Sequence, residues 1–219
     1  MTEPRDFNPA LGRPELTSQY DQVIAIMTRE RRWRSRLLTA LAPAAGETII
    51  DLGAGTGSMA VLIKEVAPAC RVIGVDPDPE VLAIARAKIE AAGQQVELVQ
   101  AAGETQGLRS GVADKVISSL VLHQCSQTAK EGLLANAFRL LKPDGRLLIA
   151  DYGLQRTPLM SMLFRQVRAL DGYENTRANK DGEIPELMAA AGFHDVAELS
   201  VTPTPTGSIS LYAGTKAGV

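Results

Sequence analysis

The stretch from Thr48 to Gly57, with the sequence TIIDLGAGTG, constrains this chain more than any other part of it. A short β-branched run leads into an acidic residue and three glycines at alternate positions, and from Ser58 onward apolar residues recur at helical spacing. Glycine accepts positive φ angles and lets the backbone approach a ligand, and the free N–H groups of the following helix point to the same place. The stretch predicts a strand, a glycine turn and a helix, with a nucleotide-like ligand at the turn.

The spacing of the glycines distinguishes between nucleotides. Counted from Gly53, a dinucleotide fingerprint needs its third glycine where this chain has Ser58, and no Lys-Ser or Lys-Thr pair follows as a P-loop requires. Asp51 would repel a pyrophosphate, whereas it suits a ligand with a positively charged amino group. An NAD-dependent oxidoreductase on a similar sheet is an alternative that Ser58 disfavours.

A second acidic strand end follows at the spacing of a βαβ unit. Residues 71–76 read RVIGVD, and Asp76 comes 19 positions after Gly57. This separation brings the end of a second strand beside the glycine turn, where a carboxylate can accept hydrogen bonds from both hydroxyls of a ribose. Asp78 is expected to cap a helix that starts at Pro79.

The rest of the chain continues this alternation of strands and helices. Further elements are expected as strands at 96–99 and 146–150, helices at 18–41, 133–141 and 185–191, and a tight turn at 142–145. A closing hairpin is expected from strands 196–201 and 208–212, with Pro203 and Pro205 in its turn. The alternation predicts a three-layer α/β fold, in which a mostly parallel sheet with one antiparallel strand has helices on both faces.

Ligands bind such sheets beyond the carboxyl ends of the parallel strands. The polar residues at the expected strand ends are Asp51, Asp76, Ser118, His123 and Asp151. We therefore expect these side chains to converge on one edge of the sheet.

The helix expected at 18–41 carries five arginines, at positions 29, 31, 32, 34 and 36, around Trp33. A short basic run of this kind is typical of a solvated helix face with the tryptophan turned inward. An anion-binding or membrane-surface patch is the alternative.

The acid and glycines of residues 51–57, followed by Asp76, resemble motif I and its partner acid in the class I S-adenosylmethionine (SAM) methyltransferases. Residues 114–123 resemble the fourth-strand segment of that family, with His123 beyond the end of the strand, and LLKPDGRLLIAD at 140–151 resembles a late motif. YDQVIAIMTRERRWR at 20–34 and ELMAAAGFHDV at 186–196 are similar to the ubiquinone/menaquinone biosynthesis methyltransferases. The resemblance implies a Rossmann-like seven-stranded sheet, S-adenosyl-L-methionine as cofactor, and methylation of a small, partly apolar acceptor at carbon or oxygen, such as a quinol or phenol. A non-catalytic SAM-binding module is the remaining alternative.

The same resemblance implies which residues hold the cofactor. They are Asp51, Gly53, Ala54, Gly55, Gly57, Asp76, Pro77, Ala102, Gly103, Glu104, Ser118, Ser119 and Leu120. The family often places an aspartate near the adenine amino group after the third strand, where this chain has Ala102. Adenine recognition is therefore expected to fall on backbone groups or on Glu104.

The acceptor side is expected to use few catalytic groups. A sulfonium methyl is already activated, so the protein mainly has to align the reactants, and no catalytic dyad is required. His123 is the candidate general base, and its alternative is a strand-end histidine with a structural hydrogen bond. The residues expected near the acceptor are Tyr20, His123, Tyr152 and Tyr173.

Composition excludes several other classes of protein. A formal net charge of −2 and a pI of about 5.8 leave no basic field for nucleic acid. The two cysteines and two histidines form no metal-binding motif, and no apolar run approaches the roughly 18 residues of a membrane span. We expect a cytoplasmic enzyme with a small-molecule substrate, no nucleic acid partner, no metal and no integral membrane segment. The oligomeric state is left open, with a homodimer among the options.

The chain length suits one domain, 1–219. Within it we expect an amino-terminal helical cap at 1–45, a cofactor-binding core at 46–153, a substrate-covering segment at 154–183, and the last helix and closing hairpin at 184–219.

Overall fold

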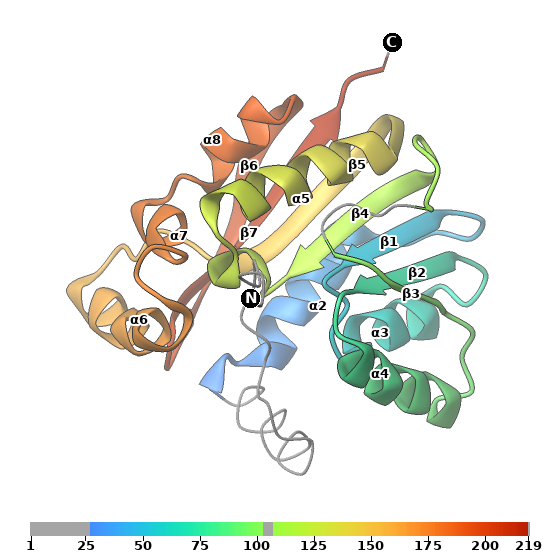
Figure 1. Cartoon of the computed structure of the whole chain (residues 1–219), viewed down its shortest axis with the longest axis horizontal. Helices are drawn as coiled ribbons and strands as arrows, with labels where there is room; N and C mark the ends of the chain where they lie inside the picture. Colours follow the sequence, from blue (N-terminus) through green and yellow to red (C-terminus); the bar gives the residue numbers. More distant parts are fainter. Residues whose placement is uncertain (1–26, 103–106, 219) are drawn as a thin grey trace, which may run out of the picture.

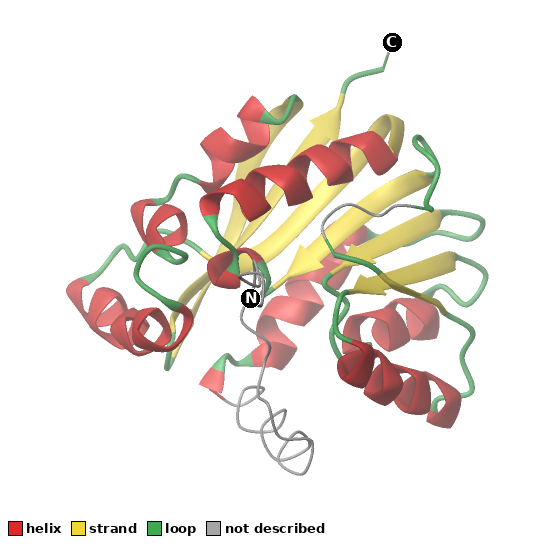
Figure 2. Ribbon diagram, in the orientation of Figure 1, coloured by secondary structure: helices red, strands yellow, loops and turns green. Residues whose placement is uncertain are grey.

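The computed structural model describes residues 27–102 and 107–218, which form a seven-stranded sheet with helices on both faces (Figures 1 and 2). The strand order is β3-β2-β1-β4-β5-β7-β6. The strands are β1 (Thr48–Leu52), β2 (Arg71–Asp76), β3 (Glu97–Gln100), β4 (Ala113–Ser119), β5 (Leu141–Tyr152), β6 (Phe193–Thr204) and β7 (Gly207–Lys216). The helices are α2 (Glu30–Leu41), α3 (Ser58–Val66), α4 (Pro79–Ala91), the 3-10 helix η2 (Leu122–Gln124), α5 (Gln127–Leu140), α6 (Pro158–Asp171), α7 (Arg177–Asp181) and α8 (Ile184–Ala190).

Strand β7 runs against both of its neighbours, while β3, β2, β1, β4 and β5 pair in parallel. The predicted α/β fold, mostly parallel with one antiparallel strand, is confirmed. Because the parallel strands share a direction, the carboxyl ends of β1, β2, β4 and β5 meet at one edge of the sheet.

Two hydrophobic layers hold the helices against the sheet. On one face, α2, α3 and α6 contribute side chains such as Leu37, Ile63 and Phe164. On the other face, α5 and α8 contribute side chains such as Leu134 and Met188. All five are almost fully excluded from solvent, so burial of apolar surface on both faces holds the strand ends in fixed relative positions.

The first βαβ unit forms as predicted. Gly57, with φ 74°, precedes α3, and a Cβ atom there would lie 3.1 Å from the Cβ of Ala85 on α4. Glycine therefore provides both the left-handed conformation and the close approach of the two helices. Asp78 caps α4 by accepting hydrogen bonds from backbone N–H groups of the first turn, and Pro79 occupies the first helical position.

The closing hairpin is longer and its turn tighter than predicted. Strands β6 and β7 stay paired up to Thr204 and Gly207, so the turn is only 205–206. The expectation that Pro203 lies in the turn is wrong, because Pro203 lies inside β6 and pairs with Ser208. Strand β6 is at the edge of the sheet, where a missing N–H on the outer side removes no ladder hydrogen bond.

Two other boundaries differ from the predictions. Residues 142–145 belong to β5, which shifts register against β4 between Ala113 and Lys115, and do not form a separate turn. The amino-terminal helix is interrupted at Arg29, whose φ of 49° cannot continue a right-handed helix, and α2 begins at the next residue. Residues 18–26 of that predicted helix lie outside the described residues.

The segment 154–183 forms α6 and α7 beside the carboxyl edge of the sheet (Figure 1). Phe164 and Val167 anchor α6 in the core. Asn175 in the following loop donates a hydrogen bond to the Gln124 carbonyl, which ties this segment to η2. Within the described residues, no helix combines the length and apolarity needed to cross a membrane.

Candidate active site

A cavity of about 280 Å³ opens at the carboxyl ends of β1, β2 and β4. It is lined by seven of the residues predicted to hold the cofactor, Gly53, Gly55, Asp76, Pro77, Ala102, Ser119 and Leu120. A wider hollow of about 620 Å³ lies near the amino ends of β2 and β3, where Arg71 pairs with Glu97. Ligands of parallel α/β sheets bind at the carboxyl edge, so the smaller cavity is the candidate site.

Asp76 connects the end of β2 to the glycine turn. Its Oδ2 accepts a hydrogen bond from the Gly55 N–H at 2.9 Å, and its Oδ1 accepts one from the Asp78 N–H at 3.0 Å. Burial raises the pKa of the Asp76 carboxyl despite both hydrogen bonds. A carboxylate accepts more than two hydrogen bonds, so Asp76 can still accept from a ligand in the cavity that it lines.

Asp51 is a buried carboxyl group without a hydrogen-bond partner in the described residues. It is 1% exposed, and neither of its oxygens is bonded. Side chains alternate along β1, so Asp51 points to the same face as Ile49, the face that α2 covers. Burial raises its pKa to about 7, while the positive charge of Arg34 lowers it and the charge of Asp76 raises it. Such a group is stabilised by any cation that is brought to it.

Arg34 on α2 acts on this same region and was not among the predicted site residues. Its Nε–H is buried without a hydrogen-bond partner in the described part of the chain, although its Nη2 pairs with Glu30. The Arg34 guanidinium lies 5.0 Å from the ring centroid of Trp33. Trp33 is 2% exposed, in agreement with the prediction that it is turned inward. Sequence could not distinguish Arg34 from the other arginines of the run, because its electrostatic effect on Asp51 depends on how α2 packs on the sheet.

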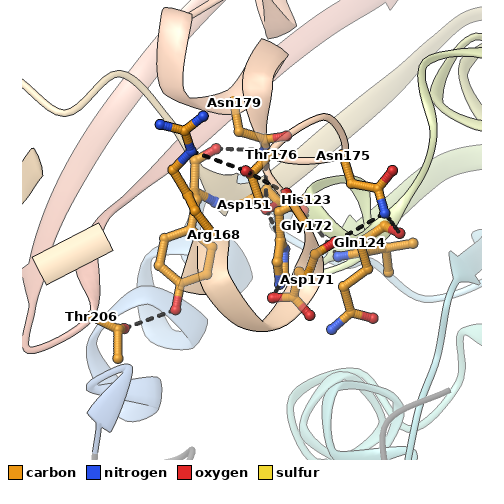
Figure 3. Close-up of polar contacts among 12 residues, drawn as sticks. His123, Gln124, Asp151, Arg168, Asp171, Gly172, Asn175, Thr176, Asn179 and Thr206 are labelled. Carbon is orange, nitrogen blue, oxygen red and sulfur yellow. Dashed lines mark hydrogen bonds and ion pairs between the residues drawn. The ribbon is translucent and has the colours of Figure 1, made fainter. Parts of the chain in front are cut away.

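His123 in η2 is held by carboxylates from two other elements (Figure 3). Its Nδ1 lies 2.8 Å from Asp151 Oδ1 at the end of β5, and its Nε2 lies 3.7 Å from Asp171 Oδ2 at the end of α6. The ring stands edge-on to Tyr152, with centroids 4.9 Å apart. Asp151 is itself fixed, because Oδ2 accepts hydrogen bonds from the backbone N–H groups of residues 121 and 122.

The protonation of His123 is set by opposing effects. Burial lowers its pKa, but the charge and hydrogen bond of Asp151, together with the charge of Asp171, outweigh burial and raise the pKa above its ordinary value. Burial also raises the pKa of Asp171, against the effect of His123. Asn179 from α7 donates to Asp151 Oδ1 at 3.3 Å and to the Tyr152 carbonyl at 2.8 Å, so α7 helps to hold the pair.

A buried ammonium group joins η2 to the segment that follows α6. Lys130 on α5 is 1% exposed, and its Nζ donates to the Cys125 carbonyl at 2.6 Å and to the Asn175 carbonyl at 2.5 Å. Burial lowers the pKa of Lys130. Sequence reasoning missed Lys130, Asp171 and Asn179, since their roles depend on contacts between elements distant in the chain.

The other predicted site residues have varied positions. The Ser118 hydroxyl is buried and donates to the Leu52 carbonyl at 2.8 Å, and it does not line the cavity. Ala54 is buried beside the turn. Tyr152 is buried in the core and its hydroxyl meets that of Thr206 at 2.8 Å. Tyr173 is exposed under the Arg168 guanidinium. The remaining three, Tyr20, Gly103 and Glu104, lie outside the described residues.

Comparison with known proteins places these features in a family. Residues 49–145 match the family model described as a methyltransferase domain. A demethylmenaquinone methyltransferase from Clavibacter sepedonicus is 30% identical over 222 residues, which cover 92% of this chain and 87% of the relative. A demethylmenaquinone methyltransferase from Thermus thermophilus is 32% identical over 140 residues, which cover 63% of each chain. The crystal structure of a SAM-dependent methyltransferase from Aquifex aeolicus has a TM-score of 0.68 at 18% identity and covers 93% of this chain and 99% of that one.

The fold and the matched domain define a SAM-dependent methyltransferase, an enzyme whose cofactor is S-adenosylmethionine. The chain belongs to the class I family of these enzymes and is similar to the ubiquinone/menaquinone biosynthesis methyltransferases. The predictions of family, cofactor and enzyme class are confirmed.

The residues of the site fit this cofactor, which carries two positive groups, a carboxylate and a ribose. Asp51 is a buried carboxyl without a cationic partner, and Arg34 has a buried Nε–H without an acceptor in the described residues. Asp76 lines the cavity with lone pairs to spare. A Cβ atom on Gly55 would meet no atom of the described residues within 4 Å, so this glycine leaves its backbone open on the side where a ligand can lie.

Proposed function

We propose that this methyltransferase acts on a hydroxylated ring in a small, partly apolar molecule, such as a quinol or phenol. The observation that carries the proposal is the buried His123, held by Asp151 in a turn whose neighbours Gln124 and Cys125 line the cofactor cavity. A histidine in this position can take a proton from a ring hydroxyl. The relatives named as demethylmenaquinone methyltransferases support an acceptor of this class.

The proposed cofactor site has three parts. Asp51 takes the ammonium group and Arg34 the carboxylate of the methionine portion, while Asp76 accepts hydrogen bonds from the ribose hydroxyls. The remaining contacts are proposed for Gly53, Ala54, Gly55, Gly57, Pro77, Ala102, Ser119 and Leu120. Ser118 serves by holding the end of β4 to β1 through its bond to the Leu52 carbonyl.

The proposed role of His123 is proton removal at Nε2. The cofactor supplies an already activated methyl group, so alignment is the main requirement and a base adds to it. The hydrogen bond from Nδ1–H to Asp151 assigns the tautomer that leaves Nε2 free to accept a proton. Asp171, at 3.7 Å, then stabilises the imidazolium. A deprotonated hydroxyl enriches both its oxygen and the ring carbons in electron density, so this step serves O- and C-methylation alike.

The segments around the core are proposed to enclose the acceptor. Two segments are proposed to flank the core at 46–153: the cap at 1–45, which contains Tyr20, and the segment 154–183, which contains Tyr173. The last helix and hairpin at 184–219 complete the core. Tyr152 would support the His123 ring from the side. We also propose a cytoplasmic location, which fractionation of cells would test.

Calorimetry tests the cofactor site. Replacing a partner of a desolvated ion pair costs on the order of 2 to 5 kcal/mol, so Asp51→Asn is expected to weaken SAM binding by roughly 30-fold or more. Glu90→Gln, which changes an exposed acid on α4, is the control and leaves binding unchanged. Equal SAM affinity in wild type and Asp51→Asn would remove Asp51 from the site.

Mass spectrometry tests the acceptor. The enzyme is incubated with SAM and a panel of quinols and phenols, among them reduced naphthoquinones that lack the ring methyl group. Gain of one methyl group by a hydroxylated ring supports the proposal. If SAM binds but every panel member stays unmethylated while an amine acceptor is methylated, the acceptor class is wrong.

A further inference from the structure

The outer surface of α6 is unusually apolar. In the described residues, seven large hydrophobic side chains are exposed, and five of them lie between Leu154 and Tyr173. Leu159, Met162 and Leu170 on α6 are 55%, 57% and 80% exposed, and Tyr173 just beyond the helix is 54% exposed. Isolated exposed apolar residues are ordinary, whereas a group on one element points to an interaction surface.

These side chains form one stripe, separate from the face that packs on the core. Leu159, Met162 and Leu170 recur at the spacing that places residues on one side of a helix. Phe164 and Val167 are buried against the sheet on another side. Anchoring of α6 is therefore complete without the outer stripe.

Basic side chains accompany this stripe. Residues 153–170 contain three arginines and no acidic residue, although the whole chain has a formal net charge of −2. Arg165 is exposed at one border of the stripe, and Arg168 lies 4.7 Å from the centroid of the Tyr173 ring. Arg156 pairs with Glu198. An apolar stripe bordered by arginine is the pattern of a helix that lies in the interface of an anionic bilayer.

The same helix ends beside the proposed base. Asp171, its last residue, is 3.7 Å from His123 Nε2, and Figure 1 shows α6 at the periphery of the molecule. A lipophilic acceptor dissolved in a bilayer under this surface would therefore meet the protein at the helix whose last residue faces His123.

We propose that the outer stripe of α6, Leu159, Met162 and Leu170, docks on the surface of an anionic lipid bilayer. The route from the bilayer to His123 rests on the proposed acceptor class, whereas the docking itself does not. A second copy of this chain is the competing occupant. Two such faces would repel one another, because each carries Arg165 and Arg168, which form no ion pair within the described residues.

Co-sedimentation of the full chain with vesicles tests the docking. Binding is expected to phosphatidylglycerol vesicles, to be weaker with phosphatidylcholine vesicles, and to fall as salt is added. The double variant Leu159→Glu/Leu170→Glu is expected to lose about tenfold or more in binding, and Arg165→Gln about fivefold. Val66→Glu is the matched control, because Val66 is 57% exposed on α3, away from the stripe, and it should bind as wild type does.

The outcomes separate the two proposals. If the α6 variants bind vesicles as strongly as wild type does, the docking proposal is wrong. It is also wrong if light scattering shows a homodimer that Leu170→Glu dissociates. The Leu159→Glu/Leu170→Glu and Arg165→Gln variants should retain SAM affinity and methyl transfer to a water-soluble phenol, which would show that they fold. If the protein binds vesicles but methylates no hydroxylated ring, only the proposed acceptor class is wrong.

Discussion

The proposed cofactor end and the proposed acceptor end of the active site are built in different ways. The glycine turn and the strand-end carboxyls of Asp51 and Asp76 come from one continuous stretch, β1 to β2, and Arg34 from α2 and Ser119 from β4 complete the proposed cofactor end. The acceptor end joins His123 from η2, Asp151 from β5 and Asp171 from α6. A local unit fixes the first, whereas the packing of distant elements fixes the second, so the two ends should respond differently to substitution.

The sharpest test of this contrast is His123→Asn. We expect the rate of methyl transfer to fall by about 10²- to 10⁴-fold with unchanged SAM affinity, because only proton removal is lost. Single-turnover kinetics and calorimetry measure the two quantities. In wild type the rate should rise with pH through the His123 pKa, which lies above its ordinary value, since only the unprotonated ring accepts a proton. A parallel loss of SAM affinity would mean that the two ends are one unit.

Gly53→Ala should damage the cofactor end. A Cβ atom there would lie 2.2 Å from Cγ2 of Val121, and φ is +78°, so the turn must move. We expect SAM affinity to fall by roughly 100-fold, which calorimetry measures. Gly46→Ala is the matched control, because its φ of +81° imposes the same backbone strain with no atom within 4 Å of the new Cβ. Similar SAM affinity in the two variants would show that the turn does not set cofactor binding.

Asp51 should make the stability of the ligand-free protein depend on pH. Its carboxyl keeps a proton up to pH about 7 when folded, whereas in the unfolded chain it loses the proton near pH 4. The folded state therefore binds more protons than the unfolded state in this pH window. The contribution of Asp51 to the free energy of unfolding falls as pH rises from about 4 to 7, by an amount on the order of 2 to 4 kcal/mol.

Urea unfolding at several pH values measures this effect. Asp51→Asn should unfold at higher urea concentrations than wild type at pH 8 and should show a flatter pH profile. Buried acids that do not interact with Asp51 contribute equally to both proteins, so the difference reports Asp51 together with its coupling to Asp76. Identical profiles would show that Asp51 is already compensated without a ligand.

The smallest effect is expected for Lys88→Met. Lys88 on α4 donates from Nζ to the hydroxyls of Thr56 and Ser58, each at 2.8 Å, which steadies the glycine turn from outside. Loss of these bonds should lower SAM affinity by about three- to tenfold. Arg86→Met, an exposed change on the same helix, is the control. A loss as large as that of Gly53→Ala would mean that side chains, more than glycine backbone, hold the turn.

The sequence predicted the fold and the cofactor well because their signals are local. Alternation of strand and helix identified the fold, and the glycine spacing with Asp76 at the next strand end identified the cofactor class. Prediction was weaker where a pattern fits two structures. Pro203 is compatible with a turn and also with an edge strand. Nothing in the run of five arginines distinguished Arg34, whose charge acts on Asp51 only because α2 packs on the sheet.

The amino-acid sequence by itself determined that this chain forms a mostly parallel sheet with a glycine turn between two acidic strand ends, because backbone conformation and strand length depend on neighbouring residues. Only the tertiary structure decided that Asp51 is buried with no hydrogen-bond partner among the described residues, and that His123 lies between Asp151 and Asp171. Those features depend on which helix faces cover the sheet. Burial and proximity between distant segments are properties of packing, and no local pattern encodes them.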